Sequence, residues 1–131
     1  MEHIASNEKI AVIKILIDIM NADNIVHESE VAYIHDVLHA FCLTEENLSD
    51  AESLTTEQAF SIIKKLPQYQ KEEVAKMLGK MIVVDQDINY NEVRIYNDFC
   101  EACDLGKAFD IDEYPGYTLS GPFVNPEDMM K

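Results

Sequence analysis

The fold is decided by a stretch that occurs twice, as "DNIVHESEVAYIHDVLHAFCL" at residues 23–43 and as "DQDINYNEVRIYNDFCEACDL" at residues 85–105. A shift of 62 residues lays one copy on the other with six identities in 21 positions. Each copy joins an acidic turn to a segment in which apolar residues recur at helical spacing. The repeat therefore predicts two helical hairpins related by an approximate two-fold axis.

Helical periodicity continues through most of the chain, and no segment alternates apolar and polar residues as a strand does. Thr44, Ser49 and Thr55 are predicted helix N-caps, and Pro67 separates two helices because proline is tolerated only near a first turn. The predicted fold is all-α, a single domain of about six helices, near residues 7–22, 28–42, 45–52, 56–65, 68–84 and 90–104.

The last part of the chain differs in composition. After Leu105 the helical pattern stops, and three of the four prolines and three of the four glycines follow. The predicted organisation is a helical domain over residues 1–105 and an irregular acidic tail over residues 106–131, either packed on the domain or trailing from it.

Charge limits the classes of partner. With 25 acidic and 10 basic residues, the formal net charge of −15 repels phosphate backbones and anionic lipids, so we expect no nucleic-acid partner. The apolar run "IAVIKILIDIM" at residues 10–20 contains Lys14 and Asp18 and is too short to span a bilayer, so no membrane insertion is expected. Three cysteines give no disulfide framework and favour the reducing cytoplasm. A protein partner is expected, and the oligomeric state is left open.

The stretch "DQDINYNE" at residues 85–92 has two interpretations. Asp85, Asp87 and Asn89 match the first, third and fifth ligand positions of an EF-hand loop, a spacing suited to calcium. The match then fails, because Tyr90 stands where the loop needs glycine and Tyr96 where it needs a bidentate glutamate. Any cation site here is incomplete and must draw further oxygen ligands from elsewhere.

The second interpretation is helix capping. Asn89 is a good N-cap, and Glu92, three residues later, can accept from the cap residue's own N–H group. Glu30 has the same offset from His27, which is a poor cap. Capping therefore explains the second copy better than the first.

The segments "NADNIVHESEVAYI" and "VVDQDINYNEVRIY" resemble the two copies of the Ala-Asp-Gly-x-Ile-x-x-x-Glu pattern of the TerB-like tellurite-resistance family. The resemblance covers residues 8–105 and implies an all-helical, acidic, cytosolic stress-response domain. It also implies metal-binding acidic positions, which fall here on Asp23, Glu30, Asp85 and Glu92. The family's glycine is replaced by Asn24 and Gln86, and glutamine tolerates a left-handed backbone poorly.

Two other groups suggest an alternative function, a metal-dependent enzyme or a redox protein. His35 and His39 lie one helical turn apart, as in a zincin motif, and Cys100 and Cys103 form a Cys-x-x-Cys pair. The histidines have no obvious third ligand. The cysteines align with Leu38 and Phe41 of the first copy, which predicts that they are core residues.

Our prediction is a non-enzymatic cytosolic interaction module that binds a divalent cation, Ca²⁺ or Mg²⁺, at its acidic turns. The predicted ligands are Asp23, Glu30, Asp85, Asp87, Asn89 and Glu92. No catalytic residue is predicted, because the chain has no recognisable nucleophile triad, glycine-rich phosphate loop or dinucleotide motif.

Overall fold

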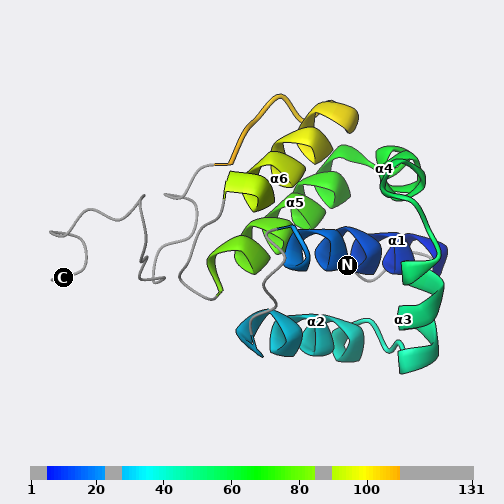
Figure 1. Cartoon of the computed structure of the whole chain (residues 1–131). Coiled ribbons are helices and arrows are strands. Elements are labelled where there is room, and N and C mark those ends of the chain that lie inside the picture. Colours follow the sequence, from blue (N-terminus) through cyan, green and yellow to red (C-terminus); the bar gives the residue numbers. More distant parts are fainter. Residues whose placement is uncertain (1–5, 23–27, 85–89, 110–131) are drawn as a thin grey trace, which may run out of the picture.

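The computed structural model describes residues 6–22, 28–84 and 90–109, and over these ranges the chain forms helices and turns without a strand (Figure 1). The six helices are α1 (Ser6–Met20), α2 (Glu28–Ala40), α3 (Glu45–Glu52), α4 (Thr56–Lys64), α5 (Gln68–Val83) and α6 (Tyr90–Ala102). The predicted all-α fold is confirmed, and every predicted boundary lies within two residues of the observed one. The proposed division at residue 105 stays a prediction, since residues 110–131 lie outside the described ranges.

Helix α1 is the centre of the domain. Seven of its 15 residues are buried, and it packs against each of the other five helices. An apolar surface that extends round so much of a helix can be covered only by neighbours on several sides. The run that could have been taken for a membrane segment is therefore the core helix, and no helix in the described part of the chain is long and apolar enough to cross a bilayer.

The two hairpins repeat at the offset read from the sequence. Shifting α2 by 62 residues reproduces both ends of α6, and the same shift places α1 on α5 to within one residue. The predicted pair of related hairpins, α1–α2 and α5–α6, is thus present in the structure.

Both hairpins end in the same C-terminal cap. The N–H of Leu43 donates to the Leu38 carbonyl and the N–H of Leu105 donates to the Cys100 carbonyl, each over 2.9 Å. The preceding residues, Cys42 (φ 59°) and Asp104 (φ 57°), adopt the left-handed conformation that this Schellman arrangement needs. The left-handed residue ends each helix two residues before the predicted boundary.

A lysine from the first helix of each hairpin completes the cap. Lys9 Nζ donates to the Phe41 carbonyl over 3.1 Å, and Lys71 Nζ donates to the Cys103 carbonyl over 2.9 Å. Both lysines are partly buried, and both carbonyls belong to the residue directly after the helix, where no intrahelical donor is available. A positive charge at this end of a helix also interacts favourably with the helix dipole.

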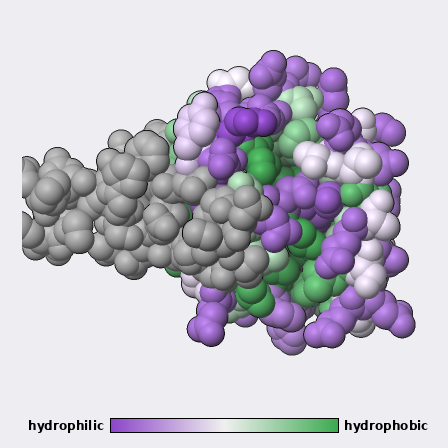
Figure 2. Space-filling model, viewed as in Figure 1, coloured by the Kyte–Doolittle hydropathy of each residue, from purple (hydrophilic) through white to green (hydrophobic). Residues whose placement is uncertain are grey.

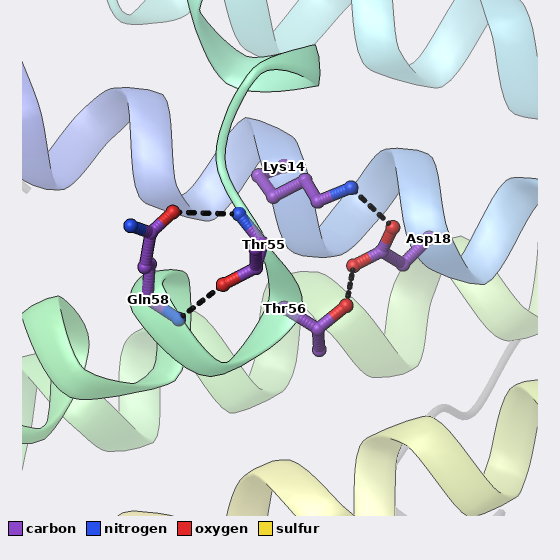
Figure 3. Close-up of polar contacts among 5 residues, drawn as sticks. All are labelled: Lys14, Asp18, Thr55, Thr56 and Gln58. Atoms are coloured by element: carbon purple, nitrogen blue, oxygen red, sulfur yellow. Dashed lines mark hydrogen bonds and ion pairs between the residues drawn. The ribbon is translucent and has the colours of Figure 1, made fainter.

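Helices α3 and α4 connect the hairpins. Thr55 and Gln58 form a reciprocal capping box, with the Thr55 N–H donating to Gln58 Oε1 over 2.8 Å and the Gln58 N–H donating to Thr55 Oγ1 over 3.1 Å (Figure 3). Thr44 also begins a helix, as predicted, and its N–H donates to Asn47 Oδ1 over 2.9 Å. The prediction for Ser49 was wrong, because this residue lies in the middle of α3.

One polar contact holds the start of α4 against α1. Thr56 Oγ1 donates to Asp18 Oδ2 over 2.7 Å, and the other oxygen of Asp18 pairs with Lys14 Nζ at 2.9 Å (Figure 3). Lys14 and Asp18, the two charged residues in the apolar run of α1, therefore neutralise each other, and Asp18 also binds the first residue of α4.

Replacing either capping lysine with methionine tests the duplicated cap. Methionine keeps the apolar stem but leaves a helix-terminal carbonyl without its charged donor, so we expect Lys9→Met and Lys71→Met each to lower the free energy of unfolding by roughly 1–2 kcal/mol. The exposed Lys76→Met is the control and should change it by less than about 0.5 kcal/mol. Urea unfolding measures all three, and equal values for the control and the capping variants would contradict the assignment.

The left-handed residues give a second prediction. A side chain at positive φ is strained where glycine is not, so Cys42→Gly and Asp104→Gly should each stabilise the fold by roughly 0.5–1 kcal/mol. Cys42→Ala keeps the Cβ atom and should bring no such gain. Thermal unfolding followed by circular dichroism distinguishes the two outcomes.

Candidate functional site

The most unusual polar side chains of the described chain are two buried glutamates. Glu30 is 0% exposed and Glu92 is 1% exposed. Each is the third residue of its helix, α2 and α6 respectively, and the two are equivalent under the shift of 62 residues. The repeat thus places one buried carboxylate in the first turn of the second helix of each hairpin.

Burial of these carboxylates has an energetic consequence. A glutamate is almost never fully buried unless it is paired, because removing a carboxylate from water costs several kcal/mol. The first turn of a helix offsets part of that cost through its free N–H groups and the positive end of the helix dipole.

The other predicted ligands lie outside the described residues. Asp23 falls within 23–27, and Asp85, Asp87 and Asn89 fall within 85–89, the segments that join the helices of each hairpin. Over residues 6–22, 28–84 and 90–109, no three His, Cys, Asp or Glu side chains gather in a group that could hold a metal ion. A cation at Glu30 or Glu92 would therefore take its remaining ligands from these connecting segments, from main-chain carbonyls or from water.

The helices of the two hairpins show on which side of the molecule the two acidic turns begin. The first turns of α2 and α6 and the last turns of α1 and α5 lie on the same side of the molecule in the view of Figure 1. Helices α2 and α6 themselves pack on the α1–α5 pair, α2 against α1 and α6 against α5 and α1. Each buried glutamate thus belongs to its own hairpin.

The histidines of the alternative enzyme hypothesis lie on the surface. His35 and His39 are both exposed on α2, and no third ligand for them occurs in the described part of the chain. His35 lines a surface groove described below, whereas His39 does not. The arrangement provides no open tetrahedral zinc site among the described residues.

The Cys-x-x-Cys pair is part of the core, as the repeat alignment predicted. Cys100 is 1% exposed and Cys103 is 0% exposed, and both are free thiols. Burial raises the pKa of the Cys103 thiol to about 11, and the positive charge of Lys71 opposes that shift only in part. A redox thiol needs an accessible thiolate, so the environment of this pair disfavours redox chemistry.

A groove of about 510 Å³ is the feature that sequence reasoning missed. It opens between α2 and α3 above the second half of α1, and its volume falls within the range of about 300–1,000 Å³ that is common for ligand sites. Its apolar lining consists of Ile17, Met20, Val31, Ile34 and Leu48. We call it the first-repeat groove.

The first-repeat groove has polar groups among its apolar residues. Lys14, Asp18, His35 and Glu52 line it together with Asn21. In the space-filling view, hydrophobic surface reaches the outside between hydrophilic side chains in the half of the molecule that contains α1, α2 and α3 (Figure 2). No local sequence motif marks this groove, because its residues come from three helices.

The three cysteines should differ in reactivity. Cys42 is exposed, whereas a Cys103 thiol with a pKa of about 11 has only about one thiolate in a thousand near pH 8. In the native protein we expect one fast reaction with a disulfide reagent, and the two buried thiols should react at least roughly a hundredfold more slowly. All three should react at similar rates in denaturant, and Cys42→Ala should remove the fast phase. Fast native labelling of Cys100 or Cys103 would support the redox alternative.

Comparison with known proteins supports the fold. The chain resembles the crystal structure of a protein of unknown function from Porphyromonas gingivalis W83, with a TM-score of 0.69, 23% sequence identity, and coverage of 83% of this chain and 93% of that one. At this identity the likeness extends to the fold alone. No family model and no curated protein matches the chain, so the TerB-like resemblance stays a prediction.

Proposed function

We propose that the chain is a non-enzymatic cytosolic interaction module that binds a divalent cation, Ca²⁺ or Mg²⁺, at its acidic interhelical turns. The observation that carries the cation part is the burial of Glu30 and Glu92 at the same position of both repeats. In this proposal, Glu30 acts with Asp23 in the first turn. In the second turn, Glu92 acts with Asp85, Asp87 and Asn89.

The oxygen chemistry of the two turns favours hard cations. Carboxylate and amide oxygens are the ligands that Ca²⁺ and Mg²⁺ prefer, and affinity rises with the number of charged ligands and the rigidity of the site. The second turn has three carboxylates against two in the first, counting only the proposed ligands. We therefore expect the second turn to bind more tightly.

The interaction part of the proposal is supported by charge. A net charge of −15 on 131 residues favours a partner with a basic surface and accelerates its approach at low salt. The free thiols support a reducing compartment. The stress-response role is what the TerB-like resemblance implies.

Cation binding is tested by calorimetric titration with Ca²⁺, Mg²⁺, Mn²⁺ and Zn²⁺, together with thermal unfolding at millimolar cation. We expect heat of binding and a thermal midpoint that rises with cation concentration, because a ligand that binds only the folded state stabilises it by about 1.4 kcal/mol at ten times its Kd. Glu30→Gln and Glu92→Gln should each remove one binding event.

Matched variants separate cation binding from capping. Glutamine can cap a helix as glutamate does, so a purely structural role predicts that Glu→Gln leaves the cation response unchanged. Asp23→Asn and Asp85→Asn should weaken the first and second events respectively, and Glu28→Gln, an exposed change in the first turn of α2, should have no effect. An absence of both heat and thermal shift in the unmodified protein would refute the cation sites.

A further inference from the structure

Two residues of the first-repeat groove have counterparts in the second hairpin that contact Phe109. Under the shift of 62 residues, the groove residues Ile34 and His35 correspond to Tyr96 and Asn97. The Phe109 ring packs edge-to-face on Tyr96 with ring centroids 5.5 Å apart, and the Phe109 N–H donates to Asn97 Oδ1 over 2.9 Å. The second repeat thus shows what these two positions can hold, an aromatic side chain on a non-helical segment with one main-chain hydrogen bond.

In the first repeat the same two positions line the groove, where Ile34 is 3% exposed and His35 is exposed. After its C-terminal cap the chain enters α3, which packs against α1, as α2 does. Ile34 and Leu48, on opposite walls, and Ile17 on the floor therefore line a space that another segment can enter. His35 supplies a ring nitrogen where Asn97 supplies its amide oxygen, and either atom can accept from a main-chain N–H.

The walls of the groove determine the charge of the occupant. Helix α2 exposes two acidic residues and α3 exposes four, of which Glu52 lines the groove, and neither helix contains a lysine or arginine. The one lysine that lines the groove, Lys14, is paired with Asp18 at 2.9 Å. An occupant with positive charges on both sides of an apolar side chain is complementary to this surface.

We propose that the first-repeat groove binds an extended basic segment of a partner protein, which inserts an aromatic side chain between Ile34 and Leu48 and donates a main-chain N–H to His35. This inference rests on the proposed interaction function and names the surface and the chemistry of the partner. It does not use the cation sites, since the groove residues and the proposed ligands are different side chains.

The test uses the full chain and a labelled synthetic peptide, Lys-Lys-Leu-Gly-Lys-Ala-Phe-Lys-Lys, which copies residues 105–109 between lysines. Fluorescence polarisation should show saturable binding that weakens at least roughly tenfold when the peptide's phenylalanine is changed to alanine. NMR shifts on titration should change most at the residues of the groove.

Variants of the protein separate docking from simple charge attraction. Leu48→Asn should weaken binding roughly tenfold, and Val31→Trp should block it by filling the groove, whereas Ser49→Asn, an exposed neighbour outside the groove, should leave it unchanged. His35→Asn, which copies the second repeat, should retain binding, while His35→Leu should weaken it about fivefold. Circular dichroism and thermal midpoints confirm that each variant is folded.

Three results would overturn the proposal. If binding is unchanged when the peptide's phenylalanine is replaced with alanine, and unchanged in both Leu48→Asn and Val31→Trp, charge attraction alone accounts for it. Self-association abolished by Leu48→Asn would assign the groove to a second copy of the chain. Tighter groove binding by a synthetic peptide of residues 110–131 would assign it to the chain's own acidic segment. Cation titration of the same groove variants should be normal, so failure of the groove and failure of the cation sites are distinguishable.

Discussion

Burial of α1 is the constraint on which the rest of the structure depends. This helix is apolar round most of its circumference, and the other five helices all pack against it. Such a helix is stable in water only when neighbours cover it on every apolar side, at roughly 25 cal/mol for each Å² removed from water. The two charged residues within its apolar run are accommodated because Lys14 and Asp18 pair and Asp18 accepts from Thr56. This packing determines where both hairpins and the groove lie.

The two repeats share a backbone and differ in what covers it. Their second helices end at equivalent residues, their left-handed caps agree within two degrees of φ, and equivalent lysines donate to equivalent carbonyls. The side chains in contact with the next segment have diverged, since Ile34 and His35 correspond to Tyr96 and Asn97. The second repeat uses these positions to hold its own Phe109, and in the first repeat they line the groove, with His35 exposed. In a duplicated scaffold, one copy of a surface can in this way serve binding while the chain itself packs on the other copy.

The buried glutamates show how one position can serve structure and binding together. A carboxylate at the third residue of a helix is stabilised by the free N–H groups of the first turn. Full burial removes the water that normally solvates a carboxylate, so interactions within the protein or with a bound ion have to replace it. Either a cation or a hydrogen-bond donor can interact with the buried carboxylate. Only with a cation does the free energy of unfolding depend on cation concentration. That dependence is what distinguishes a binding site from a cap.

The helical order, the repeat and the core positions of Cys100 and Cys103 could all be read from the sequence, because they depend on local periodicity and on a constant offset between two copies. The offset also relates Lys9 to Lys71, but their shared role was recognised only when the helix ends that they cap were known. Ser49 was misassigned because a cap motif is a local signal that helix packing can override. Only the tertiary structure decided that Glu30 and Glu92 are buried and that a groove opens between α2 and α3. Both properties depend on how separate helices cover α1, and a pattern along one segment does not encode the distance to another.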